Sequence, residues 1–291
     1  MTAGIAVTDL RVSYGAVHAV RGVSFDVPGG TALGLVGESG SGKSTVARAI
    51  VGLTPSTGAI TIGGVDVSGL RGRQARRARR GVHLVFQDYR GSLDPRYTVG
   101  QCVREGMRDV PAGRASARVA ELLELVSLDP ALAAVRPGAL SGGQRQRVAI
   151  ARALAARPDV LIADEVTASL DVSVQAVVLN LIRRLRAELG LTMIFISHNL
   201  AVVRYMCDDL AVMLRGEIVE RGSVEEVIGR PTHPYTRSLL AAVPVVGQRR
   251  LLADEPVEAA EAVEAVEAVE AVEAAPSPAA GARGGSRPAA G

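Results

Sequence analysis

The sequence predicts an α/β fold with a mostly parallel sheet and an inserted helical part. Short apolar runs at residues 32–36, 82–86, 160–163 and 192–196 are typical of buried strands. Helical patterns lie between them, and strands that alternate with helices favour a parallel sheet. Residues from about 88 to 155 hold helical patterns without an evident strand, which indicates a helical insertion into the α/β core.

The elements follow one another in a consistent order. Residues 17–27 alternate loosely and predict β structure at the start of the domain. The strand at 32–36 leads straight into a glycine-rich loop, after which residues 44–53 predict a helix. Apolar residues at positions i, i+3, i+4 and i+7 predict further helices over 119–126 and 174–189.

Composition separates one folded domain, residues 1–245, from a tail. The chain has 291 residues and is 48% apolar, which is enough for an ordinary core. Residues 257–274 repeat Glu-Ala-Val, and a period of three drifts around a helix of 3.6 residues per turn. We therefore expect the tail at 253–291 to be disordered or transiently helical.

Several classes of protein are excluded or disfavoured. Cys102 and Cys207 lie far apart without ligand spacing, which argues against a disulfide framework, a zinc site or an iron–sulfur cluster. No apolar run has the roughly 18 residues of a membrane span, and no signal peptide is evident at the N-terminus. The arginine-rich segment 71–80 lacks interleaved aromatic residues, so a solvated face is favoured over nucleic-acid binding.

Residues 37–45, Gly-Glu-Ser-Gly-Ser-Gly-Lys-Ser-Thr, match the phosphate-loop pattern G-x-x-x-x-G-K-[ST]. The backbone of such a loop cradles phosphates, Lys43 would reach the β- and γ-phosphates, and Ser44 would bind Mg²⁺. Lys43 is the one lysine among 33 basic residues. A compact ammonium on a flexible stem can reach between phosphates where a planar guanidinium cannot replace it freely. The predicted contact residues are Gly37, Glu38, Ser39, Gly40, Ser41, Gly42, Lys43, Ser44 and Thr45.

Two further segments carry chemistry. Asp164 and Glu165 follow the apolar strand 160–163, where a Mg²⁺ ligand and a catalytic base are expected beside a phosphate loop. Ser141, Gly142, Gly143 and Gln144 open a helix, whose N-terminus is a second place for an anion.

The segment Leu140 to Gln144, followed by RQRVAIARAL, resembles the signature motif of ABC ATPases. The resemblance covers residues 4 to about 245. It implies a phosphate-loop NTPase core with a mostly parallel sheet, an antiparallel β subdomain and an inserted α-helical subdomain. It also implies that Tyr14 stacks on adenine, and that residues 168–171 form the D-loop.

The same resemblance implies a catalytic arrangement. Glu165, Gln87 and His198 would act on the attacking water and the γ-phosphate of ATP, while Ser44, Gln87 and Asp164 would hold Mg²⁺. Ser141 to Gln144 would contact ATP bound to a second ATP-binding subunit, identical or different. Further implied partners are membrane permease subunits and, indirectly, an extracytoplasmic solute-binding protein. The chain would be peripheral on the cytoplasmic face of the membrane and would not bind nucleic acid.

Residues 86–96, and residues 231–244 with their Pro-Thr-His-Pro-Tyr-Thr start, resemble oligopeptide, dipeptide and nickel importers. The implied function is therefore ATP hydrolysis that energises import of peptides or a related solute. A non-transport ABC ATPase acting on nucleic acid or the ribosome is the alternative, although such proteins carry coiled-coil insertions or two motif sets. A regulator that only binds ATP is disfavoured because Glu165, Gln87 and His198 are all present.

Overall fold

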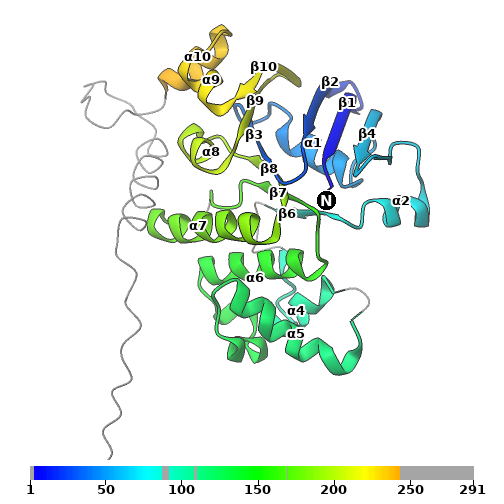
Figure 1. Cartoon of the computed structure of the whole chain (residues 1–291), viewed down its shortest axis with the longest axis vertical. Coiled ribbons are helices and arrows are strands. Elements are labelled where there is room, and N and C mark those ends of the chain that lie inside the picture. Colours follow the sequence, from blue (N-terminus) through cyan, green and yellow to red (C-terminus); the bar gives the residue numbers. More distant parts are fainter. Residues whose placement is uncertain (1–2, 87–91, 108–109, 169, 243–291) are drawn as a thin grey trace, which may run out of the picture.

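The computed structural model describes residues 3–86, 92–107, 110–168 and 170–242. The predictions for Gln87 and for the tail at 253–291 lie outside these residues. A six-stranded sheet in the order β10-β9-β3-β8-β7-β6 forms the centre of the molecule (Figure 1). Its neighbours pair in parallel except for β10, which is antiparallel to β9. The strands are β3 (Ala32–Val36), β6 (Val82–Val85), β7 (Val160–Asp164), β8 (Thr192–Ile196), β9 (Asp209–Leu214) and β10 (Glu217–Ser223).

A second sheet is antiparallel and has the order β2-β1-β4-β5. Its strands are β1 (Ile5–Tyr14), β2 (Val17–Val27), β4 (Thr57–Ile62) and β5 (Val65–Asp66). Helix α1 (Lys43–Ile50) packs on β1 and β2 of this sheet and on β7 of the other, so one apolar core joins the two sheets. Together the sheets confirm the predicted α/β fold with an antiparallel part.

The helices between β6 and β7 form a group at one end of the molecule (Figure 1). This group contains α4 (Val99–Glu105), α5 (Ala112–Leu125), two short 3₁₀ helices (Pro130–Ala134 and Pro137–Ala139) and α6 (Gly142–Ala155). The other helices are α2 (Gly72–Ala78), α7 (Val172–Leu189), α8 (Leu200–Met206), α9 (Val224–Gly229) and α10 (Pro234–Ala241). Among the described residues, no helix is long and apolar enough to span a membrane.

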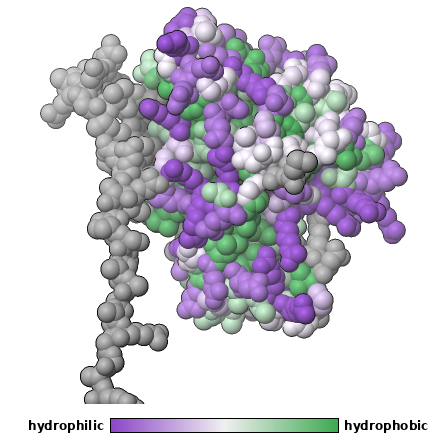
Figure 2. Space-filling model, in the orientation of Figure 1, coloured by the Kyte–Doolittle hydropathy of each residue, from purple (hydrophilic) through white to green (hydrophobic). Residues whose placement is uncertain are grey.

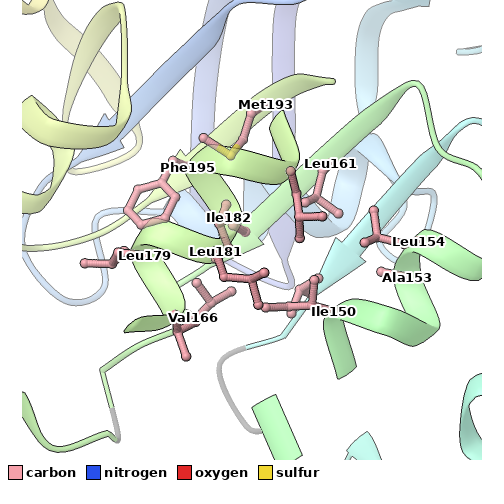
Figure 3. Close-up of a cluster of buried hydrophobic side chains, with 14 of the residues drawn as sticks. Ile150, Ala153, Leu154, Leu161, Val166, Leu179, Leu181, Ile182, Met193 and Phe195 are labelled. Atoms are coloured by element: carbon pink, nitrogen blue, oxygen red, sulfur yellow. The ribbon is translucent and has the colours of Figure 1, made fainter. Parts of the chain in front are cut away.

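The helical group is joined to the sheet by a shared apolar core. Figure 3 shows side chains of α6, α7, β7 and β8 meeting in one cluster. Ile150 and Leu161, 1% and 2% exposed, are deep members of this cluster. This packing holds α6 against the sheet. It therefore fixes the position of the N-terminus of α6 relative to β7 and β8.

The arginine-rich segment 71–80 forms helix α2 and the turn after it. Hydrophilic residues project from the right edge of Figure 2, where Figure 1 places α2. One arginine departs from the predicted solvated face: Arg79 is partly buried and donates hydrogen bonds to the carbonyls of Ile50 and Val67. Its guanidinium therefore ties the end of α2 to the end of α1 and to the residue that follows β5.

Candidate functional site

The phosphate-loop segment 37–42 leaves β3 and enters α1 in a conformation that requires glycine. Gly37 has φ 147° and Gly42 has φ 107°, both in a region that L side chains rarely adopt. A Cβ on Gly37 would lie 2.2 Å from the carbonyl oxygen of Met213, and one on Gly42 would lie 2.5 Å from that of Ala19. The loop is thus pressed against β9 and β2, which fixes its path.

Lys43 lies inside this loop. Its side chain is buried, at 4% exposed, and Nζ donates to the carbonyl oxygens of Gly37 and Glu38 at 2.6 and 2.8 Å. A third contact joins Nζ to Oγ of Ser41 at 3.3 Å. Burial lowers the pKa of Lys43, although the nearby carboxylates of Glu165 and Asp164 oppose the effect. The ammonium group of Lys43 is therefore held inside the loop by these contacts.

Ser44 and Asp164 form the next contact. The Ser44 hydroxyl donates to Oδ1 of Asp164 at 2.9 Å. Burial raises the pKa of Asp164, with a further contribution from the charge of Glu165, while the Ser44 hydrogen bond opposes this rise. A hydroxyl beside a carboxylate is a donor set that suits Mg²⁺, which takes few protein ligands and fills its shell with phosphate oxygens and water. Consistently, the described residues hold no group of three or more His, Cys, Asp or Glu side chains that could enclose a metal.

Glu165 follows Asp164 at the end of β7 in a left-handed conformation, with φ 46°. Its backbone N–H donates to the carbonyl of Ile196 at 3.0 Å, so β8 holds it in place. Its Oε1 lies 3.5 Å from Nδ1 of His198, which follows β8. This contact lowers the pKa of Glu165 more than burial raises it, so the carboxyl group remains ionised near neutral pH. A strained backbone at a partly buried carboxylate is typical of functional sites.

A cavity opens beside Glu165 and His198, at the ends of β7 and β8. Ser39 of the phosphate loop lines it together with four polar residues that sequence analysis did not single out: Thr167, Gln175, Ser197 and Asn199. The amide of Gln175 donates to the Thr167 hydroxyl at 2.9 Å, and the Asn199 side chain caps α8. Asn199 could have been found from its position before an apolar helix, since Asn is a preferred N-cap.

The structure places the remaining predicted site residues elsewhere. Tyr14 is 51% exposed at the end of β1, with its hydroxyl 3.4 Å from that of Thr54. Ser141 caps α6 through a reciprocal pair of hydrogen bonds with Gln144, and Gly143 packs against Val174 of α7. The main packing partners of α6 are α4, α5, α7 and β6, whereas those of α1 are β1, β2 and β7. Segment 141–144 thus belongs to the helical group, away from the phosphate loop (Figure 1).

Two family models match the chain. One is described as "ABC transporter" and matches residues 20–168. The other is described as "Oligopeptide/dipeptide transporter, C-terminal region" and matches residues 219–267.

Known proteins similar to the chain have related descriptions. A putative peptide import ATP-binding protein of Brucella ovis is 48% identical over 226 residues, which are 76% of this chain and 71% of that protein. The oligopeptide transport ATP-binding protein OppD of Mycobacterium bovis is 47% identical over 238 residues, which are 81% of this chain and 39% of that protein.

Solved structures agree with these matches. The dimeric post-hydrolysis ATP-binding cassette MJ0796, bound to ADP and Pi, has a TM-score of 0.68 and 28% identity, covering 76% of this chain and 98% of the cassette. The cbiO1 protein of Clostridium perfringens, part of the ABC transporter complex cbiONQ, has a TM-score of 0.70 and 29% identity, covering 78% and 90%.

Proposed function

The chain belongs to the ABC transporter family, and we propose that it energises peptide import as one of two ATP-binding subunits of a membrane transporter. Family membership makes it an ATPase subunit, which binds ATP and hydrolyses it.

One observation carries the assignment of the residues. Lys43, Ser44, Asp164, Glu165 and His198 come from distant parts of the sequence and meet at the carboxyl ends of β3, β7 and β8. Ligands of parallel α/β sheets bind at this edge. A cluster that joins an ammonium, a hydroxyl, two carboxylates and an imidazole beside a phosphate loop has the components that phosphoryl transfer requires.

Each group has a role in the proposed reaction. Lys43 leaves the loop carbonyls and pairs with the β- and γ-phosphates, to which the loop residues Gly37 to Thr45 offer their backbone N–H groups. Ser44 and Asp164, with Gln87, would hold Mg²⁺, which neutralises phosphate charge when it is bound. Glu165, whose pKa is lowered by the contact with His198, accepts a hydrogen bond from the attacking water and takes up its proton, and His198 reaches the γ-phosphate.

The second half of the site comes from another subunit in this proposal. Ser141, Gly142, Gly143 and Gln144 lie at the N-terminus of α6, at a distance from the phosphate loop of their own chain. Such an N-terminus offers backbone N–H groups and a positive dipole end to an anion. A partner's phosphates would therefore be bound there, while Tyr14 stacks on the adenine. The similar cassette MJ0796 is a dimer.

The match of residues 219–267 to the peptide-transporter C-terminal region supports a peptide as the transported solute. Membrane permease subunits would anchor the chain to the cytoplasmic face of the membrane, and an extracytoplasmic binding protein would deliver the peptide to them. The similar protein cbiO1 is part of the ABC transporter complex cbiONQ. We propose residues 1–245 as the nucleotide-binding domain and 253–291 as a separate tail.

Glu165→Gln tests the central assignment in the assembled transporter. The substitution keeps the size of the side chain and removes its basicity, so ATP turnover and peptide uptake should fall about 10²- to 10⁴-fold while ATP binding persists. Glu188→Gln is a matched control, because Glu188 is an exposed residue of α7 that pairs with Arg184. Near-normal turnover of Glu165→Gln would exclude Glu165 as the base.

A further inference from the structure

Helix α10 reaches the phosphate loop through one side chain. The backbone N–H of Glu38 donates a hydrogen bond to the Tyr235 hydroxyl at 2.9 Å, although 197 positions separate the two residues. The Tyr235 ring is partly buried and packs against the main apolar core. Because this ring has few free torsions, its hydroxyl is held in place at the loop.

Tyr235 and Lys43 bind opposite ends of one peptide unit. The carbonyl oxygen of Gly37 accepts from Nζ of Lys43 at 2.6 Å, while the N–H of the same peptide bond, on Glu38, donates to Tyr235. Gly37 itself has φ 147°, a conformation that only glycine adopts readily. Hydrogen bonds from Lys43 and to Tyr235 therefore hold this peptide unit at both of its ends.

A chain of hydrogen bonds positions Tyr235. Glu220 of β10 accepts from the backbone N–H groups of Thr232 and His233 at 2.6 and 3.0 Å, and from the Thr232 hydroxyl at 2.9 Å. Nδ1 of His233 in turn accepts from the backbone N–H of Tyr235 at 3.1 Å and caps α10. Burial would raise the pKa of Glu220, but these hydrogen bonds outweigh it and lower the pKa to about 2. The carboxyl group of Glu220 is therefore ionised near neutral pH.

We propose that Tyr235 is a positioning residue for the phosphate loop, and that Glu220, His233 and Tyr235 form a brace that couples α10 to nucleotide binding. The inference rests on the proposed function. When Lys43 turns to the phosphates, the Gly37 carbonyl loses its partner, and Tyr235 continues to hold the peptide unit from the N–H side. Coupling of this kind is reciprocal, so a partner that displaced α10 would weaken ATP binding, and ATP would stabilise the docked α10.

Tyr235→Phe removes one oxygen atom and tests the brace in the full chain. Without nucleotide, the Glu38 amide should exchange its hydrogen faster than in the wild type. With a fluorescent ATP analogue, affinity should fall roughly threefold to tenfold, which is the value of one hydrogen bond. In the assembled transporter KM for ATP should rise while kcat stays unchanged, because the substitution leaves Glu165 and His198 in place.

Tyr205→Phe is the matched control. The Tyr205 hydroxyl donates to Asn180 of α7, so its loss affects α7 and α8 and not the loop. A general loss of stability would lower the melting temperature of both variants, whereas only Tyr235→Phe should weaken ATP binding and speed exchange at Glu38.

Glu220→Gln tests the far end of the brace, since an amide offers one acceptor oxygen where the carboxylate offers two. Like Tyr235→Phe, it should lower the affinity for ATP. Because both substitutions act through one contact, the double variant Glu220→Gln/Tyr235→Phe should bind ATP no less tightly than whichever single variant binds it less tightly. Unchanged Glu38 exchange and unchanged ATP affinity in Tyr235→Phe would overturn the inference. That result would leave the proposed function intact, because the latter depends on Glu165→Gln.

Discussion

Ser44 donates a 2.9 Å hydrogen bond to Asp164 across 120 positions of the sequence. The carboxyl group is buried, at 3% exposed, and burial raises its pKa. An acid whose pKa is higher in the folded protein than in the unfolded chain costs stability whenever it is ionised. The nucleotide-free protein thus carries a buried charge that lowers its stability, which is typical of a functional site.

Asp164→Asn should therefore separate stability from activity. The amide oxygen still accepts from Ser44, but the buried charge is gone, so the melting temperature of the nucleotide-free protein should rise at neutral pH. The gain should shrink as pH falls, and should vanish below about 3.9, where the aspartate is protonated in both states. Mg²⁺-dependent ATP turnover should fall about 10- to 100-fold through loss of a charged ligand.

The measurements are melting curves between about pH 3 and 8, which span the unperturbed aspartate pKa, and a Mg²⁺ titration of ATP turnover. Asp159→Asn is the control, because Asp159 is an exposed carboxylate at the opposite end of β7. If Asp164→Asn destabilised the protein at neutral pH, burial of this charge would not be the unfavourable contribution described here.

Lys43→Arg should weaken ATP binding although it keeps the charge. Nζ lies within 3.3 Å of three oxygen atoms of the loop in a nearly fully buried position. A planar guanidinium is larger and cannot rotate its donors between the loop carbonyls and two phosphates. Loss of the charge-assisted contacts should weaken binding of a fluorescent ATP analogue by about 10- to 100-fold. Arg48→Lys, on the exposed side of α1, should bind as the wild type does.

Four strands of the central sheet, β3, β6, β7 and β8, could be predicted from the sequence because they are short apolar runs, whereas β9 and β10 were not predicted. β3, β7 and β8 are buried at every position, and each falls where the sequence analysis expects a strand. β1 and β4 were not predicted because half of the residues of β1 and a third of those of β4 are exposed, and because irregularities in their pairing blur the alternation. Helix α1 ends at Ile50, before the expected 53, where Gly52 turns the chain with φ 79°.

Local motifs predicted the phosphate loop and the two carboxylates, because the residues of each motif are neighbours in the sequence. The contact between Glu38 and Tyr235 could not be predicted in this way. Residues 231–236 indicated only a family resemblance, and it is the packing of α10 against the core that brings Tyr235 to the loop. The same holds for the cavity residues Thr167 and Gln175, which belong to no motif.

Removal of His198 should move the acid limit of ATP turnover to a higher pH. The contact with His198 is the main cause of the lowered pKa of Glu165. A base must be ionised to act, so turnover is lost as pH falls through this pKa. In His198→Gln the pKa of Glu165 should rise, and the residual turnover should disappear at a higher pH than in the wild type. Turnover against pH at saturating ATP measures this, and an unmoved acid limb would contradict it.

Gly143→Ala should loosen the contact between the signature segment and α7. A Cβ at this position would lie 2.3 Å from Cγ1 of Val174. Such overpacking costs about 1–3 kcal/mol, which alanine's better helix propensity, about 1 kcal/mol, offsets only in part. The melting temperature should fall, whereas Gly138→Ala, with open space around its Cβ, should leave it unchanged. Adding Val174→Ala removes the clashing methyl group and should restore stability to Gly143→Ala; independent effects of the two substitutions would show that this close approach does not set the spacing of α6 and α7.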